Sequence, residues 1–374
     1  MIYLDNAATS FPKPEEVYKR IDHVLRHISG NPGRASHRMA IEASRVIYAA
    51  REAVARLINI PDSSRVVFTK NATEAINIAL KGILKPGDHA VTTSFEHNSV
   101  VKTLGRLSEG GVKVTKVRPC LEGFIALKDV EKAIIKETRI VCVSHASNVF
   151  GSLQDIREIG RLCRQKGVIF MVDGAQTVGA LPTDADYMNI DILAATGHKA
   201  LFGPQGTGFL YLREGIEPEA LVNGGTGEME VVLEIPERLE SGTMNTPGVG
   251  GLSAGVEFLL KEGVEKIRSH EVSLVREIIS GLNENRRIRI IGTLDASKRA
   301  SLVAFNIEGK TPAEVGSRLD EEFSILVRTG AHCAPEAHRE AGTHPDGAIR
   351  VSPGYFTAEK DIEELLRAIR TIAK

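Results

Sequence analysis

A lysine and an aspartate each follow a short apolar run of the chain. The run from Ile190 to Ala195 leads into Thr196-Gly197-His198-Lys199, and the run from Val168 to Val172 ends at Asp173. Apolar runs of this length, bounded by turn residues, are typical of buried strands in a parallel sheet. Because functional side chains in such sheets gather at the carboxyl ends of the strands, we expect Lys199 and Asp173 at the same edge.

This pair has the chemistry that pyridoxal 5'-phosphate (PLP) requires. A lysine held by rigid backbone can attack an aldehyde when it is partly desolvated or lies near a cation. PLP also needs an acid near its ring nitrogen, which keeps the ring able to accept electrons. Taken singly, Lys199 could be a solvated loop lysine and Asp173 a turn or cap residue. The two together favour a cofactor site.

Several spaced motifs resemble one family. Asp173-Gly174-Ala175-Gln176 and Thr196-Gly197-His198-Lys199, with Tyr3-Leu4-Asp5-Asn6-Ala7-Ala8-Thr9 near the start, resemble the class V aminotransferases and, within them, the cysteine desulfurases. The resemblance extends to Arg350-Val351-Ser352-Pro353-Gly354 and so covers nearly the whole chain. It implies an α/β fold of the fold-type I PLP-dependent transferases. In that fold a large domain with a mainly parallel sheet flanked by helices is joined to a smaller C-terminal α+β domain.

The resemblance also implies how the cofactor is held. The phosphate would lie at the strand-to-helix turn, on the N–H of Ala72 and on Thr73. Thr196 and His198 would add side-chain donors. His97 would stack on the ring, while Asn148 and Gln176 would contact its oxygen-bearing edge. Thr243 would reach the phosphate of a neighbouring subunit, which implies a homodimer. The cofactor-binding set is Ala72, Thr73, His97, Asn148, Asp173, Gln176, Thr196, His198, Lys199 and Thr243.

Thr73, His97 and Thr243 also have a structural alternative. Any fold needs helix caps, so the turn at Thr73 is weak support by itself. A single histidine after a strand is more often structural than catalytic, and Thr243 could belong to a simple helix lead-in. The shared order of the motifs favours the cofactor-binding interpretation.

The segment Arg328-Thr329-Gly330-Ala331-His332-Cys333-Ala334-Pro335 resembles the catalytic loop of group II cysteine desulfurases, the type associated with sulfur mobilisation and with selenocysteine lyases. Ala331 stands where many members carry a second histidine. A thiolate attacks sulfur far better than a thiol, so Cys333 would need a lowered pKa or a nearby proton acceptor such as His332, PLP or the substrate imine.

This loop sets the expected reaction. Lys199, Cys333 and His97 would be catalytic, and sulfur would pass from L-cysteine to Cys333 with release of L-alanine. Arg350 would pair with the substrate carboxylate, a bidentate fit that guanidinium gives and lysine does not, and Asn148 would also contact the substrate. Arg350 could otherwise be a surface arginine. A sulfur-acceptor protein is expected, but the sequence does not identify it.

Other interpretations remain open. L-selenocysteine could be the substrate, or the chain could be another class V aminotransferase or lyase. A non-enzymatic alternative is a PLP-binding regulator or a sulfur-carrier partner, which would not need Lys199, Asp173, His97 and Arg350 together. The histidines around Cys333 could suggest a metal site, but no CxxC pair or HExxH helix is present, so we expect no metal.

Composition sets the broad class. The chain has 374 residues, 42% hydrophobic and 25% charged, with a formal net charge of −1. This balance is ordinary for a globular protein and argues against a nucleic-acid surface. The first residues show no signal-peptide pattern and no run is long enough to span a membrane, so we expect a cytoplasmic protein without membrane segments. The other cysteines, Cys120, Cys142 and Cys163, are too scattered for a disulfide framework.

The pattern along the chain predicts two domains. Strands alternate with helical stretches from about residue 65 to 211, which indicates a parallel sheet with helices on both faces. After about residue 250 the pattern changes to a smaller α+β arrangement, in which one strand is expected over 325–328. We therefore expect a large PLP-binding domain at 15–250 and a small domain formed by 1–14 and 251–374.

Overall fold

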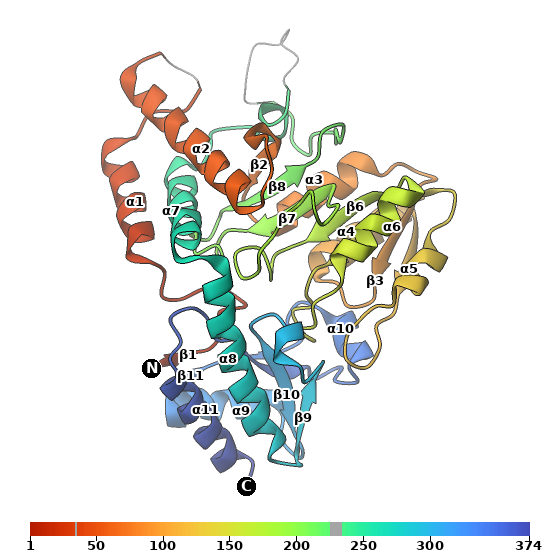
Figure 1. Ribbon diagram of the computed structural model, residues 1–374, viewed down its shortest axis with the longest axis vertical. Helices are drawn as coiled ribbons and strands as arrows, with labels where there is room; N and C mark the ends of the chain where they lie inside the picture. Colours follow the sequence, from red (N-terminus) through yellow and green to blue (C-terminus); the bar gives the residue numbers. More distant parts are fainter. Residues whose placement is uncertain (34–35, 225–233) are drawn as a thin grey trace.

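The computed structural model describes residues 1–33, 36–224 and 234–374. It contains a main sheet and a smaller second sheet, each packed against its own helices (Figure 1). The strands are β1 Ile2–Tyr3, β2 Val66–Thr69, β3 His89–Thr93, β4 Lys113–Val117, β5 Thr138–Ser144, β6 Ile169–Asp173, β7 Ile192–Thr196, β8 Gly208–Leu212, β9 Ile288–Ile291, β10 Val303–Ile307, β11 Ile325–Leu326, β12 Arg328–Gly330 and β13 Ala348–Val351. The helices are α1 Glu15–His27, α2 Arg38–Leu57, α3 Ala72–Ile83, α4 Asn98–Glu109, α5 Leu127–Ala133, α6 Ile156–Lys166, α7 Thr246–Glu262, α8 Val264–Asn283, α9 Pro312–Phe323, α10 Pro335–Glu340 and α11 Glu359–Ile372.

Over the described part of the chain, the main sheet has seven strands in the order β2-β8-β7-β6-β5-β3-β4. Strand β8 runs antiparallel to β2 and β7, and the remaining neighbours are parallel. The expected α/β fold with a mainly parallel sheet is therefore confirmed. Since β8 lies antiparallel between them, β2 and β7 point the same way, and the carboxyl end of β2 reaches the same edge as those of the parallel strands.

Alternation along β5 shows why helices cover both faces of this sheet. Val141 and Val143 pack in one apolar core with α2, α6 and α7, while Ile140 and Cys142 pack in another with α3 and α4. Successive residues of a strand point to opposite faces, so a strand that is apolar at every position must be covered twice. Each face then buries its apolar side chains against an amphipathic helix layer.

The second sheet is smaller and antiparallel, in the order β12-β13-β10-β9. Its core contains apolar side chains of α8, α9 and α11, such as Leu274, Leu319 and Ile369. A parallel pair of strands, β1 with β11, joins the N-terminal segment to this region through the partners Ile2 and Ile325. Figure 1 shows α8 running from the main sheet to the second one.

The expectation of a single strand over 325–328 is wrong in detail. The chain forms β11 with β1 and then, after Val327, forms β12 with β13 in a different sheet. A periodic apolar pattern cannot reveal this change of sheet, because both halves have the same local preference for extended backbone. The change matters for the site, since it sets the register of Arg328.

The helices α7 and α8 meet at Gly263, which has a φ of 85°. Val249, Leu252 and Leu259 of α7 pack in the core of the main sheet, whereas α8 contributes Leu274 to the core of the second sheet. The predicted boundary at residue 250 thus falls within α7. The division into 15–250 and 1–14 with 251–374 stays a prediction.

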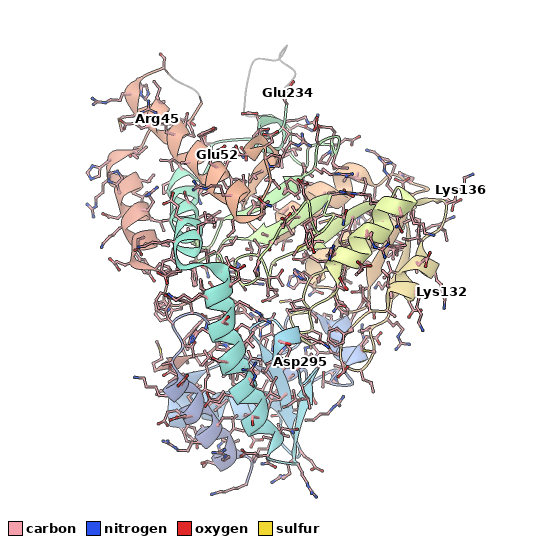
Figure 2. The ribbon with its side chains drawn as sticks, in the orientation of Figure 1. Arg45, Glu52, Lys132, Lys136, Glu234 and Asp295 are labelled. Carbon is pink, nitrogen blue, oxygen red and sulfur yellow. The ribbon has the colours of Figure 1, made fainter. Side chains whose placement is uncertain are left out.

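Side chains of both charges are exposed at the surface. Arg45, Lys132 and Asp295 are examples from different parts of the molecule (Figure 2). Across residues 1–33, 36–224 and 234–374, no helix combines the length and apolar character needed to cross a bilayer.

Glu271 of α8 has a carboxyl group that is buried between the region of the main sheet and the region of the second sheet. It is 6% exposed, and its Oε2 has no hydrogen-bond partner among the described residues. Burial raises its pKa to about 8, against the opposing effect of the Arg268 guanidinium. The folded protein therefore keeps a proton that the unfolded chain has released above its ordinary pKa of 4.5.

We predict that Glu271→Gln flattens the pH dependence of stability. A raised pKa contributes stability that is present at low pH and is lost as pH rises through the folded pKa of about 8. The wild-type free energy of unfolding should therefore fall relative to the variant by roughly 1.4 kcal/mol per pH unit between about pH 6 and 8. Urea unfolding at several pH values measures this difference. Glu265→Gln, at an exposed position of the same helix, is the matched control, and parallel curves for Glu271→Gln and wild type would contradict the prediction.

Candidate active site

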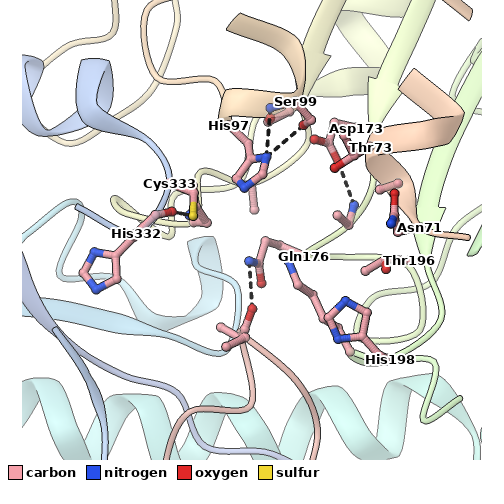
Figure 3. A pocket seen from close by; sticks show the side chains of 18 of the residues that line it. Asn71, Thr73, His97, Ser99, Asp173, Gln176, Thr196, His198, His332 and Cys333 are labelled. Atoms are coloured by element: carbon pink, nitrogen blue, oxygen red, sulfur yellow. Dashed lines mark hydrogen bonds between the residues drawn. The ribbon is translucent and has the colours of Figure 1, made fainter. Parts of the chain in front are cut away.

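The predicted residues meet at the carboxyl ends of neighbouring strands. The parallel register of β5, β6 and β7 aligns Ser144 with Asp173, and Asp173 with Ala194. The chain segments that leave these strands enclose a cavity of about 270 Å³, close to the lower end of the ~300–1,000 Å³ typical of small-molecule sites. The lining residues named from the sequence are Ala72, Thr73, His97, Asn148, Asp173, Gln176, Thr196, His198, Lys199, Cys333 and Arg350 (Figure 3).

Thr243 is the one predicted residue that does not line this cavity. It lies in a separate depression, together with Lys70, Glu74 and Leu221. Its expected place is at the phosphate of another subunit, so its position outside the cavity of its own chain leaves that role a prediction.

Glycine packing fixes the turn that carries Lys199. Gly197 donates its N–H to the Thr207 carbonyl at 2.8 Å, and the Gly203 N–H bonds to the Gly197 carbonyl at 2.7 Å. A Cβ at Gly197 would lie 2.1 Å from Thr207 Oγ1, so only glycine fits. The lysine follows two residues later and lines the cavity.

Burial lowers the pKa of Lys199 to about 8. The Asp173 carboxylate opposes this shift, and the guanidinium groups of Arg350 and Arg328 add to it. A considerable fraction of the amine is therefore neutral near physiological pH, as a nucleophile or base requires.

His97 has its tautomer set by the start of α4. The Ser99 backbone N–H donates to His97 Nδ1 at 3.1 Å, and the Ser99 hydroxyl lies 2.8 Å from the same nitrogen (Figure 3). Because Nδ1 accepts a backbone N–H, the neutral ring carries its proton on Nε2. Burial lowers the pKa of His97, which favours this neutral form.

Unpaired polar atoms around the cavity test whether PLP fits. Thr196 Oγ1 and His198 Nδ1 are buried and lack hydrogen-bond partners among the described residues. Helix α3 begins beside them at Ala72, where free N–H groups bind anions well. Donors converging on one spot fit a phosphate. Asp173, whose Oδ1 accepts the Ala175 N–H at 2.9 Å, supplies a carboxylate in the same cavity.

A second buried carboxyl lies behind the site. Glu96 is 0% exposed and accepts hydrogen bonds from the Thr93 hydroxyl at 2.6 Å and the Ser144 hydroxyl at 2.5 Å. Burial raises its pKa to about 7. Glu96 was not among the residues predicted from the sequence, because a loop glutamate is normally solvated. Its place beside His97 was the only local signal.

Two arginines face the cavity from the small sheet. The antiparallel register of β12 and β13 places Arg328 directly opposite Arg350. Like charges in such pairs oppose each other unless an anion lies between or beside them. Arg350 donates to Asp5 Oδ1 at 3.0 Å and to the Asn148 carbonyl at 3.2 Å, while its Nε has no partner in the described residues. Arg350 thus retains donors for a ligand anion.

Arg328 was not among the sequence candidates, although it opens the Cys333 motif. Its Nη2 lies 3.7 Å from Cys333 Sγ. The guanidinium group of Arg328 therefore lies within hydrogen-bond distance of the sulfur.

His332 does not serve Cys333 as a base. Its ring points away from the neighbouring sulfur (Figure 3), and its Nδ1 lies 3.1 Å from His338 Nε2. Burial, aided by the Arg350 charge, lowers its pKa to about 2. Of the proton acceptors considered from the sequence, His332 is therefore poorly placed, whereas Arg328 offers a charge. Within the described ranges, no group of three or more His, Cys, Asp or Glu side chains is arranged to hold a metal ion.

The chain is similar to known proteins along its whole length. The family model described as Aminotransferase class-V matches residues 2–365. A probable cysteine desulfurase of Methanothermobacter thermautotrophicus is 34% identical over 100% of this chain and 94% of its own. A probable cysteine desulfurase of Pyrococcus abyssi is 35% identical with the same coverage of both chains. The apo structure of a cysteine desulfurase from Thermococcus onnurineus has a TM-score of 0.93 at 34% identity, covering 100% of this chain and 94% of that one.

We predict that capture of PLP by the apoprotein follows the ionisation of Lys199. Since only the neutral amine attacks an aldehyde, the capture rate should rise about ten-fold per pH unit below the pKa of about 8 and level off above it. Absorbance after mixing measures the rate, and Lys199→Arg should abolish the signal.

Lys13 provides the matched control. Burial also lowers its pKa to about 8, but its Nζ bonds to Ser10 Oγ at 3.0 Å and it does not line the cavity. Lys13→Arg should leave the profile unchanged. A profile that is flat from about pH 6 upward would contradict the assignment of Lys199.

Proposed function

Because the chain belongs to the aminotransferase class-V family, we propose that it is a PLP-dependent cysteine desulfurase, which converts L-cysteine to L-alanine and receives the sulfur on Cys333. One observation supports this above all others. Cys333 lies on the same cavity as Lys199 and Asp173, with its sulfur 3.7 Å from the Arg328 guanidinium. An aminotransferase has no need of a thiol at that place.

The proposed cofactor supplies, when bound, an electrophilic aldehyde and a ring that accepts electrons from the substrate carbon. Its phosphate would lie on the N–H of Ala72, Thr73, Thr196 and His198. Asp173 would face the ring nitrogen, and His97 would cover one face of the ring. Asn148 and Gln176 would lie at its oxygen-bearing edge.

Residues of the chain itself would bind the substrate, transfer the proton and accept the sulfur. Arg350, with Asn148, would bind the substrate carboxylate. The Lys199 amine, with its pKa lowered to about 8, would take the proton from the substrate α carbon. The Cys333 thiolate would attack the substrate sulfur, so that an S–S bond forms and the carbon–sulfur bond breaks. The electron pair of that bond would stay with the carbon, which is protonated to give alanine, and the terminal sulfur would remain on Cys333 as a persulfide.

We further propose the group II type, on the likeness of Arg328-Thr329-Gly330-Ala331-His332-Cys333. L-selenocysteine is the alternative substrate, because the same attack cleaves a carbon–selenium bond. The persulfide would pass to an acceptor protein through the mouth of the cavity, where Cys333 is exposed.

A homodimer is also part of the proposal. Helices α1 and α2 expose large apolar side chains, among them Leu25 at 59% and Tyr48 at 62%. Both helices pack against α7, and an exposed apolar patch is typical of an interface. Thr243 would then complete the phosphate site of the other subunit.

We predict that Cys333→Ala reduces the release of alanine and sulfide from L-cysteine, with a reductant present, by about 100-fold or more. The absorbance of bound PLP should be retained, because Cys333 is not among the residues that would hold the cofactor. Cys120→Ala, at another exposed cysteine, is the control and should keep full activity. If wild type binds PLP yet forms neither product, the desulfurase proposal fails. In a parallel assay with L-selenocysteine as the substrate, release of selenide by a wild type that releases no sulfide from L-cysteine would favour selenocysteine.

Subunit complementation tests the role of Thr243. Lys199→Ala and Thr243→Asp should each be inactive, the second because its carboxylate repels the phosphate. In a mixed dimer, a Thr243 that acts across the interface leaves one site intact. Random reassociation should therefore restore about a quarter of wild-type activity, since about half of the dimers are mixed. No restoration would contradict action across the interface.

A further inference from the structure

A chain of buried hydrogen bonds lies behind Cys333, and none of its side chains has a role in the proposed reaction. Thr343 Oγ1 lies 2.7 Å from His338 Nδ1, and His338 Nε2 lies 3.1 Å from His332 Nδ1. The other nitrogen of His332 faces the Arg328 carbonyl at 3.5 Å. His332 and His338 are 4% and 1% exposed.

The partners set the direction of this chain. A carbonyl oxygen only accepts, so His332 carries its proton on Nε2 and accepts at Nδ1. His338 must then donate from Nε2 and accept at Nδ1 from the Thr343 hydroxyl. Burial lowers the pKa of His332 to about 2 and of His338 to about 4, so both rings are neutral, as this arrangement requires.

His332, the last member of this hydrogen-bond chain, and the following Cys333 have an unusual backbone conformation. His332 and Cys333 have φ values of 49° and 57°, in the left-handed region that L-residues rarely adopt. Two contacts hold their carbonyls from the main sheet. Asn148 Nδ2 donates to the His332 carbonyl at 2.6 Å, and the Asn98 N–H donates to the Cys333 carbonyl at 2.9 Å.

We propose that His338, oriented by Thr343, is a positioning residue for Cys333. With the backbone carbonyls held from one side, the His338 imidazole holds the His332 ring from the other. The left-handed pair is thereby kept in the form that places the sulfur beside Arg328 at the cavity. The inference rests on the proposed function in that it takes Cys333 to be the sulfur acceptor.

Replacing His338 should act locally, because helix α10 has other anchors. Glu336 pairs with Lys116 at 2.6 Å and Glu340 pairs with Arg118 at 2.9 Å, both on or next to the edge strand β4. These contacts do not involve the histidine and keep α10 against the main sheet when the ring is removed.

The test compares His338→Leu, His338→Gln and Thr343→Val in the PLP-loaded protein. One readout is the alkylation rate of Cys333 by iodoacetamide, measured by mass spectrometry relative to Cys120 in the same molecule. The other is kcat and KM for L-cysteine. His338→Leu should lower the alkylation ratio and kcat about ten-fold or more, because the sulfur leaves the Arg328 guanidinium. KM and the PLP absorbance should stay near their wild-type values.

The conservative variants separate positioning from general stability. Gln can still donate to His332, so His338→Gln should recover most of the alkylation ratio, and Thr343→Val should lie between His338→Leu and wild type. His89→Leu is the matched control. His89 is 2% exposed at the start of β3, and its ring nitrogens lie 2.8 Å from the hydroxyls of Thr138 and Thr115. This variant should lose stability without changing the ratio.

An unchanged alkylation ratio in both His338→Leu and Thr343→Val would overturn the proposal. A fall of the alkylation ratio in His89→Leu equal to that in His338→Leu would also overturn the proposal. If His338→Leu does not fold, His338→Gln and Thr343→Val still test the proposal. A positioning role for His338 requires these two variants to have different alkylation ratios. A wild type that makes no alanine would end the desulfurase proposal, but the alkylation ratio would still test the positioning of Cys333.

Discussion

The parallel pairing of β5, β6 and β7 is the constraint on which the site depends. Their register places the residues that follow Ser144, Asp173 and Thr196 side by side, with a lysine on the last of these segments. Each strand is apolar on both faces, so the helices on either side hold it against sliding. A shift of one residue would turn Asp173 away from the cavity.

The small sheet contributes positive charge to a cavity that is also lined by segments leaving the main sheet and by Ala7 and Ala8. It places two arginines opposite each other, with Cys333 nearby. Such a pair is unfavourable by itself and is suited to anions, here a carboxylate and a thiolate. Asp5 forms an ion pair with Arg350 and offsets part of its charge, whereas the charge of Arg328 remains available to the sulfur of Cys333. The division of these two charges is what the proposed reaction needs.

Features that depend on local sequence could be predicted, and features that depend on distant pairing could not. The runs before Asp173 and Lys199 indicate buried strands, and the order of such strands places their carboxyl ends together. The alternation of strands and helices from about residue 65 to 211 was also predicted, and the strands and helices of the main sheet, from β2 to β8, occupy that stretch. By contrast, the opposition of Arg328 and Arg350 follows from the pairing of β12 with β13, and the chain of His332, His338 and Thr343 follows from the folding of the loop. No pattern within a short window contains either.

The attachment of the N-terminal segment bears on how the protein is made. Ile2 pairs with Ile325, Asp5 bonds to Arg350, and Ala7 and Ala8 line the cavity. Ile2 and Asp5 must therefore wait for partners that are synthesised much later than they are. During that interval the apolar strands of the main sheet can already pair, while the cavity still lacks both arginines. Assembly of the sheet and completion of the site are thus separate events in the synthesis of one chain.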